Sequence, residues 1–269
     1  MIKKYKISVP KSTLNEIYKK VNKFPWSATQ NMNGWEYGTN LNYLKSISKY
    51  WITKYSWKKF ENKINSFKNY KTKVEDINLH FIFEKSKNPN SKPLLLLHGW
   101  PGSITEFLNI IPRLAHPEKF GGKIEDGFDI IVPSLPGFGF SSQIKKALGP
   151  RKIGKILNKF MVKNLGYKNY FVQGGDWGAT IAGWIGLDSS KNCKGIHINC
   201  LPLRHPKGTK NIKERKWEKK FNFDQIMQEG YRTQQATKPQ TLSYAMIDSP
   251  VGTAAWILEK FHGWSDLKM

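Results

Sequence analysis

The feature of this sequence that most constrains its fold is an alternation of apolar, strand-like runs with amphipathic, helix-like runs from about residue 73 to residue 200. Strands that alternate with helices favour a largely parallel α/β sheet. The predicted strands are two within 74–86, joined by a short turn, and one each at 94–97, 129–133, 170–173 and 196–200. The predicted helices are 104–114, 151–165 and 177–189.

Helical segments flank this region on both sides. Residues 1–72 are rich in aromatic side chains, and Thr13 and Glu16 have the spacing of a capping box, which predicts a helix start. The apolar runs weaken after Pro202, and residues 206–269 predict helices joined by loops. We therefore expect three parts with boundaries near residues 72 and 205.

The chain is strongly basic, with a net charge of +24. Most of the basic residues are lysines scattered along the whole chain, whereas arginine is the residue favoured for bidentate recognition of phosphate. The arginines are Arg113, Arg151, Arg204, Arg215 and Arg232. We interpret the charge as a solvated surface and expect no nucleic-acid partner.

The sequence shows no sign of a secreted, membrane-anchored or metal-binding protein. Cys193 and Cys200 make neither a disulfide framework nor a metal cluster, so we expect reduced thiols, a cytoplasmic location and no metal. The N-terminus lacks an apolar run of signal-peptide length, and no stretch approaches the length of a membrane span. Nothing in the sequence sets the oligomeric state.

Three unusual loops follow predicted strands. They are His98–Ser103 (HGWPGS), Ser134–Ser141 (SLPGFGFS) and Gly174–Gly178 (GGDWG). In parallel sheets the ligand site lies beyond the carboxyl ends of the strands, so the loops should converge there. The third has the outline of a nucleophile elbow with Asp176 in place of serine. A plainer interpretation makes Asp176 the N-cap of the following helix.

Together these loops resemble the α/β-hydrolase superfamily and, within it, the microsomal-type epoxide hydrolases. The resemblance extends over nearly the whole chain, including WEYG at 35–38, EGYRTQQATKPQT at 229–241 and DSPVGTAAWILEKF at 248–261. It implies an α/β-hydrolase fold with an N-terminal meander over residues 1–72, the first part of the core over 73–205 and an incomplete helical cap over 206–269.

The resemblance also implies roles for particular residues. A carboxylate attacks a strained sp³ carbon directly and forms an ester, so Asp176 would be the nucleophile. The backbone N–H groups of Trp100 and Trp177 would form the oxyanion hole, and Tyr231 would donate a proton to the epoxide oxygen. Trp100, Pro101, Phe138 and Trp177 would contact the substrate. The expected reactants are a small apolar epoxide and water, with no cofactor.

The water-activating pair of the family is not recognisable after Asp176. None of the later histidines and aspartates follows a predicted strand: His205, His262, Asp224, Asp248 and Asp266. A second cap tyrosine also has no match. We therefore expect a truncated, catalytically incomplete enzyme whose strand 196–200 lies at an exposed edge. His98 should shape its loop, and His197 should be a hydrogen-bonded core residue.

Three other interpretations stay open. A haloalkane dehalogenase also uses an aspartate followed by tryptophan, but that family typically has asparagine at the position of Trp100 and lacks the N-terminal meander. A non-catalytic remnant would bind apolar ligands or pair with another chain. A basic nucleic-acid binder has no motif in its favour.

Overall fold

The computed structural model describes residues 1–30, 32, 34–200, 208–209 and 211–267. The chain divides into two compact units. The first comprises Met1–Ser8 and Lys58–Leu203, and the second comprises Val9–Trp57 and Arg204–Met269. Each unit therefore combines segments that lie far apart in the sequence.

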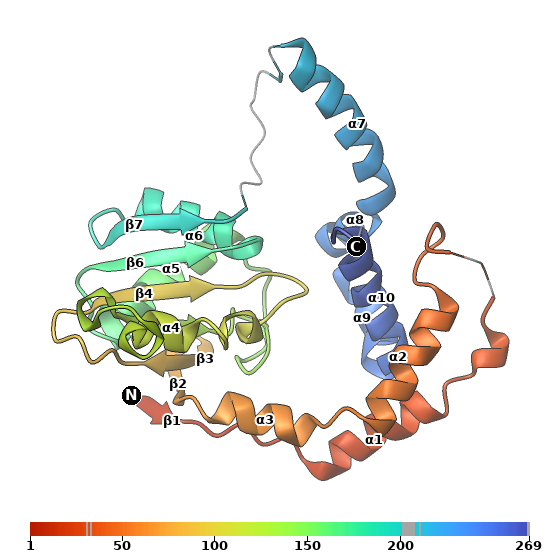
Figure 1. Cartoon of the computed structure of the whole chain (residues 1–269), viewed down its shortest axis with the longest axis horizontal. Helices are drawn as coiled ribbons and strands as arrows, with labels where there is room; N and C mark the ends of the chain where they lie inside the picture. Colours follow the sequence, from red (N-terminus) through yellow and green to blue (C-terminus); the bar gives the residue numbers. More distant parts are fainter. Residues whose placement is uncertain (31, 33, 201–207, 210, 268–269) are drawn as a thin grey trace. The chain divides into compact units, whose positions relative to one another are not determined.

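The first unit is built on a seven-stranded mixed sheet (Figure 1). The strands are β1 (Ile2–Lys4), β2 (Asn69–Val74), β3 (Ile77–Glu84), β4 (Lys92–Leu97), β5 (Phe128–Pro133), β6 (Tyr170–Gly174) and β7 (Cys193–Ile198). Their spatial order is β1-β2-β3-β5-β4-β6-β7. The pairs β4–β5, β4–β6 and β6–β7 are parallel, and the others are antiparallel. Of the two strands predicted within 74–86, the second is β3, whereas the first, β2, lies earlier in the chain and shares only Val74 with that range. The other four predicted strands are present, and β1 is an additional one.

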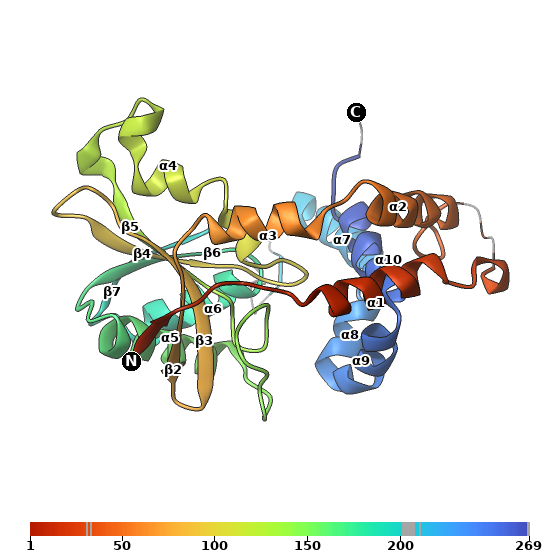
Figure 2. The same ribbon diagram turned by 90° about the horizontal axis from the view of Figure 1, so that it is seen from below.

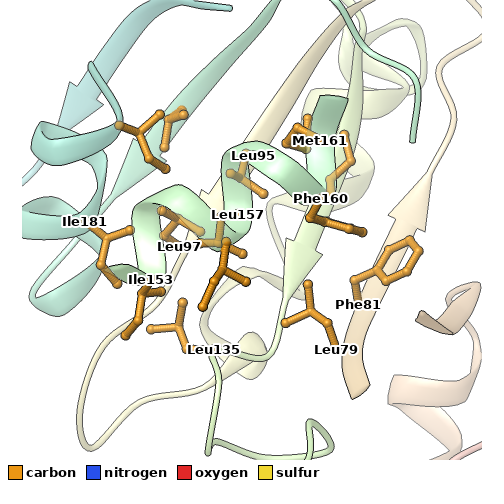
Figure 3. Packing of buried hydrophobic residues seen from close by; sticks show 14 of the residues in the cluster. Leu79, Phe81, Leu95, Leu97, Leu135, Ile153, Leu157, Phe160, Met161 and Ile181 are labelled. Carbon is orange, nitrogen blue, oxygen red and sulfur yellow. The ribbon is translucent and has the colours of Figure 1, made fainter. Parts of the chain in front are cut away.

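Helices cover both faces of this sheet (Figure 2). Helix α4 (Ile111–Ala115) lies on one face, and the paired helices α5 (Pro150–Lys159) and α6 (Trp177–Asp188) lie on the other. Leu95 and Leu97 belong to the core cluster that includes side chains of α5 and α6 (Figure 3). Leu96 points to the opposite face by the period of a strand and is also buried. Burial on both faces explains the continuous apolar run of β4.

Two predicted helices are not α-helical along their whole length. The first is interrupted: a 3₁₀ turn, η2 (Ile104–Phe107), precedes α4. Pro112 in the first turn of α4 has no N–H to donate, so the hydrogen bonds of one continuous helix cannot run through it. The second predicted helix ends as the π-helical turn η5 (Phe160–Asn164) after α5, where Phe160 and Met161 are fully buried.

Strand β7 lies at one edge of the sheet, as predicted, although its residues start earlier than expected. Within the described residues no strand pairs with its outer side. Ile196 is 44% exposed, and His197 is exposed as well. The expectation that His197 is a core residue is therefore wrong, because an edge strand leaves side chains uncovered.

The second unit is helical. Its helices are α1 (Lys11–Asn22), α2 (Leu41–Thr53), α7 (Ile212–Gln228), α8 (Gly230–Thr237), α9 (Pro239–Asp248) and α10 (Pro250–Gly263), while α3 (Trp57–Asn65) leads into the first unit. Val21 of α1, Leu44 of α2 and Val251 of α10 form a buried core. Among the helices described, none is both long and apolar enough to cross a bilayer.

Two helices of this unit begin at a residue whose side chain caps them, and a third begins without such a cap. Asn40 caps α2 by accepting from the Tyr43 N–H, and Ser249 caps α10 by accepting from the Gly252 N–H. Helix α1 instead begins at Lys11 after Pro10, which has no side-chain cap. The predicted capping box that starts at Thr13 is therefore wrong.

Candidate active site

Asp176 lies at the turn where β6 passes into α6. Its backbone has φ 50° and ψ −124°, a conformation that costs a non-glycine residue about 1–3 kcal/mol. Among the described residues of α6, none donates a capping hydrogen bond to the Asp176 carboxylate. The plainer interpretation of Asp176 as a helix cap is therefore not what the geometry shows.

Glycines around Asp176 allow neighbouring backbone segments to approach one another closely. A Cβ atom on Gly174 would lie 2.1 Å from the Gly178 carbonyl oxygen, and one on Gly178 would lie 2.1 Å from the Leu97 carbonyl oxygen. A Cβ atom on Gly99 would lie 2.1 Å from Asp176 Oδ1. The glycines around Asp176 are therefore a packing requirement, and they bring the ends of β4 and β6 together.

The loop after β4 contacts the Asp176 carboxylate directly. The backbone N–H of Trp100 donates a hydrogen bond of 2.9 Å to Asp176 Oδ1. Pro101 follows Trp100 through a cis peptide bond. Trp177 is the first residue of α6, and the N–H groups of a first helical turn have no intrahelical acceptor. The structure thus places one of the two expected oxyanion donors on the carboxylate and the other beside it in the sequence.

His98 joins the loop after β4 to the loop after β5. The ring is fully buried, and the Leu135 N–H donates to His98 Nε2 at 3.1 Å. Because Nε2 accepts, Nδ1 carries the hydrogen and donates it to the Gly99 carbonyl oxygen at 3.1 Å. Burial lowers the pKa of His98, against the opposing effects of the Gly99 carbonyl and the Asp176 charge. Both ring nitrogens of a neutral His98 are therefore occupied in holding loops.

Phe138 lies in the loop after β5 and packs its ring edge-on against His98, with ring centroids 5.3 Å apart. It also packs against the core cluster that covers α5 and α6. Phe138 thus supports the His98 ring from within the first unit.

Tyr231 belongs to the second unit, near the start of α8. Its ring contacts the Trp264 ring edge-on at 5.1 Å. The ammonium group of Lys260 lies over the Tyr231 ring, 5.0 Å from its centroid. Lys260 is itself 3% exposed and pairs with Glu259, so Tyr231 sits beside a buried cation.

Two residues considered for a water-activating pair contact other side chains of the second unit. His262 stacks on Trp35, with ring centroids 3.8 Å apart. Asp248 ends α9 and forms an ion pair with Lys20 at 2.6 Å. His205 lies outside the described residues. These contacts assign no proton-transfer role to His262 or Asp248.

The sequence analysis missed Glu106, which belongs to η2 directly after the Trp100 loop. Glu106 is exposed, and its carboxylate lies beside Gly102, where an added Cβ atom would be 1.8 Å from Glu106 Oε1. Burial and then the charge of Asp176 raise the pKa of Glu106, while N–H groups of Gly99 and Ser103 lower it. A signal existed, because Ser103 and Glu106 have the spacing of a capping box.

Two family models match the sequence. The model described as "Epoxide hydrolase N terminus" matches residues 2–107, and the model described as "alpha/beta hydrolase fold" matches residues 92–246. The second match covers more than half of the chain and includes the loops around Trp100 and Asp176.

Curated proteins and solved structures similar to this chain are described as epoxide hydrolases. A putative epoxide hydrolase from Stigmatella aurantiaca is 39% identical over 98% of this chain and 61% of its own length. Epoxide hydrolase 1 from Oryctolagus cuniculus is 35% identical over 98% of this chain and 63% of its own length. The crystal structure of juvenile hormone epoxide hydrolase from the silkworm Bombyx mori superimposes with a TM-score of 0.88 at 32% identity, covering 99% of this chain and 67% of that one. The chain thus spans about three fifths of the length of these curated relatives.

Proposed function

Because this chain belongs to the epoxide hydrolases of the α/β-hydrolase fold, we propose that it opens small apolar epoxides with Asp176 as the nucleophile. The observation that carries this proposal is the position of Asp176 at a strained strand-to-helix turn, with the Trp100 N–H on Oδ1. Carboxylates are ionised near neutral pH and can attack a strained sp³ carbon without a base.

In the first step, Asp176 Oδ2 forms a bond to one epoxide carbon while the bond from that carbon to the epoxide oxygen breaks. The leaving oxygen takes the phenolic proton of Tyr231, which gives a hydroxyalkyl ester on Asp176. The Trp100 N–H holds Oδ1 and so leaves Oδ2 for the substrate; the Trp177 N–H is the second donor for the charge that develops on Oδ1 in the next step. The side chains of Trp100, Pro101, Phe138 and Trp177 line the substrate site.

In the second step, water attacks the ester carbonyl carbon, and the diol leaves with the oxygen that had attacked the epoxide. One proton of the water goes to that leaving oxygen and the other restores the Tyr231 phenol, which returns Asp176 to a carboxylate. Negative charge develops on Oδ1, where the same N–H groups stabilise it. The attacking water must lose a proton, and general-base help is worth about 10²–10⁴-fold. Neither His98, whose nitrogens are occupied, nor His262, which stacks on Trp35, is assigned that task. We infer that this chain forms the ester faster than it hydrolyses it.

Mass spectrometry tests the nucleophile. The 269-residue chain is incubated with an aromatic epoxide, and intact mass and peptide mapping then locate the added group. We expect one adduct on the peptide that contains Asp176, none in Asp176→Asn, and an unchanged adduct in the control Asp126→Asn, whose side chain is exposed elsewhere on the first unit. An adduct of equal yield in Asp176→Asn would overturn the assignment. Sustained diol production would retain the activity but overturn slow ester hydrolysis.

The same assay distinguishes dehalogenation. A terminal chloroalkane would give an alkyl ester on the same carboxylate with release of chloride, and this reaction needs no proton on the leaving group. Because Trp100 stands where dehalogenases typically have asparagine, we expect no chloride release. Chloride release without any adduct from the epoxide would favour the dehalogenase instead.

A further inference from the structure

Lys260 of α10 is a buried cation that takes part in neither step above. The residue is 3% exposed, and burial of an ammonium group is costly unless its charge is compensated and its N–H groups find acceptors. Its Nζ donates to the Gln228 carbonyl oxygen at 3.2 Å and forms an ion pair with Glu259 at 2.8 Å. On this ground alone Lys260 would only tie α10 to the end of α7.

Two aromatic rings also lie around the Lys260 ammonium group. Its Nζ is 5.0 Å from the centroid of the Tyr231 ring and 5.9 Å from that of the Trp264 ring. The two rings contact each other edge-on, with centroids 5.1 Å apart. The face of an aromatic ring attracts a cation, and the attraction is stronger where the cation is desolvated. Lys260 thus contacts the tyrosine that the mechanism above uses as proton donor.

Lys260 also holds the turn that leads into Tyr231. Gln228 ends α7 and Tyr231 is the second residue of α8, so only Glu229 lies between the two helices. The Lys260 ammonium group binds the carbonyl oxygen of Gln228. Gly263 lets α10 lie close to this turn, since a Cβ atom on it would be 2.7 Å from Gln228 Oε1. Lys260 is therefore bound both to the ring of Tyr231 and to the backbone three residues before it.

The charge of Lys260 acts when Tyr231 gives up its proton. The phenol then becomes a phenolate, whose negative charge spreads into the ring that Lys260 contacts. A fixed positive charge stabilises a negative charge that develops beside it without any rearrangement. The Glu259 carboxylate opposes this effect, but its side chain is 25% exposed, so water screens its charge better than that of Lys260.

We propose that Lys260 is a positioning residue for the proton donor, which fixes the Tyr231 ring and stabilises the phenolate that remains after proton transfer. The proposal rests on the proposed function of Tyr231 and Asp176. Lys260 keeps its own protons throughout, and the phenolic proton goes to the leaving oxygen as above. The expected signature is slower ester formation with unchanged substrate binding, because the proposal gives Lys260 no contact with the epoxide.

The test measures ester formation on Asp176 in a single turnover, by intact mass against time over a range of styrene oxide concentrations. Lys260→Met keeps the length of the side chain without its charge. It should lower the maximal rate constant by about 10–10²-fold, with the half-saturating concentration within about twofold. Lys260→Arg should recover most of the rate, because it keeps the charge and the N–H donors. Lys49→Met, exposed on α2 of the same unit, is the matched control and should behave as the unmodified chain.

A double substitution shows whether Lys260 acts through Tyr231. In the Tyr231→Phe chain no phenolate forms, so Lys260→Met should change the maximal rate constant there by no more than about twofold. An equal loss with and without the Tyr231 hydroxyl would mean that Lys260 only supports the fold, and it would overturn the proposal. An unchanged rate in Lys260→Met, or an equal loss in Lys260→Arg, would overturn it as well.

If Lys260→Met does not fold, Glu259→Gln replaces it in this assay. The substitution removes the opposing carboxylate and leaves the Lys260 ammonium group on the carbonyl and side-chain oxygens of Gln228. The maximal rate constant should then rise by about two- to tenfold, because the charge over the Tyr231 ring is less compensated. A decrease or an unchanged value would overturn the proposal.

A measurement without epoxide separates this inference from the proposed function. Urea unfolding is compared for Lys260→Met, Tyr231→Leu and the double variant. Because the cation and the ring stabilise each other, Lys260→Met should lower the unfolding midpoint less when the ring is already absent. If the unmodified chain forms no ester, the proposed function fails, and this comparison alone decides whether Lys260 holds Tyr231. Equal decreases would overturn that contact even if the ester forms.

Discussion

The backbone N–H of Trp100 donates a hydrogen bond to Asp176 Oδ1 across 76 residues of sequence. The contact joins the loop after β4 to the turn after β6, which are neighbours in the parallel part of the sheet. It occupies one carboxylate oxygen and leaves the other to be directed at a substrate. We make four further predictions, each about a named residue of the chain.

Substitution of Gly178 by alanine should disrupt the turn that carries Asp176. The added Cβ atom would lie 2.1 Å from the Leu97 carbonyl oxygen, and a backbone clash cannot be relieved by rotating a side chain. We expect the free energy of unfolding to fall by about 3 kcal/mol or more. Gly183→Ala, in the same helix and with nothing within 4 Å of its Cβ, should instead raise it by about 0.5–1 kcal/mol. Urea unfolding checks both, and equal effects would contradict the tight approach.

Acid should destabilise the first unit through His80. The ring is fully buried and hydrogen bonds to Ser134 Oγ and Asn69 Oδ1, and burial, with a smaller effect of the Lys71 charge, lowers its pKa to about 3. An unfolded histidine titrates near pH 6.5, so the unfolded state binds more protons between these values and stability falls as the pH is lowered. The expected slope is about 1.4 kcal/mol per pH unit.

Urea unfolding at several pH values between about 6.5 and 4.5 measures that slope. The variant His80→Gln should be less stable at neutral pH but should lose stability less steeply on acidification. His98, whose pKa is also lowered, adds a slope of the same sign in both proteins. An equal slope in the two proteins would show that His80 is not the group responsible.

His98 should be a neutral ring that carries its hydrogen on Nδ1. The Leu135 N–H donates to Nε2, so protonation of that nitrogen would set two donors against each other. NMR of the ring nitrogens should find Nδ1 protonated and Nε2 bare at neutral pH, and the burial that lowers the pKa of His98 should delay its protonation on acidification. A proton on Nε2 would contradict the loop-holding role and would reopen His98 as a base.

Replacement of Tyr231 by phenylalanine should slow ester formation on Asp176. The leaving oxygen would lose its proton donor, which contributes about 10²–10⁴-fold. Tyr244→Phe is the matched control, since Tyr244 lies on α9 of the same unit and is 66% exposed. Single-turnover mass spectrometry compares the two variants. Equal rates would remove Tyr231 from the proposed mechanism.

Much of the fold could be predicted from the sequence because burial repeats locally. The apolar run 94–97 and the alternation within 74–86 identified strands without knowledge of their partners. The placement of Asp176 at a strand-to-helix corner followed from glycines on either side of it. These features depend on residues close together in the chain, so periodicity and turn chemistry are sufficient to find them.

The features that periodicity could not supply depend on contacts between distant segments. Strand β1 has no apolar pattern and is ordered by pairing with β2. His197 sits in a strand-like run, yet it is exposed because β7 lies at the sheet edge. Neither result can be read from neighbouring residues, because each is decided by which strand lies alongside.

The sequence by itself determined the central strands, the helices that follow them and the corner at which Asp176 stands. Only the tertiary structure decided which hydrogen-bonding groups meet there: the Trp100 N–H on Oδ1, and the Leu135 N–H that sets the tautomer of His98. The physical reason is that a hydrogen bond requires a donor and an acceptor within about 3 Å and in line. That condition is met only after the sheet has brought residues far apart in the chain into one place.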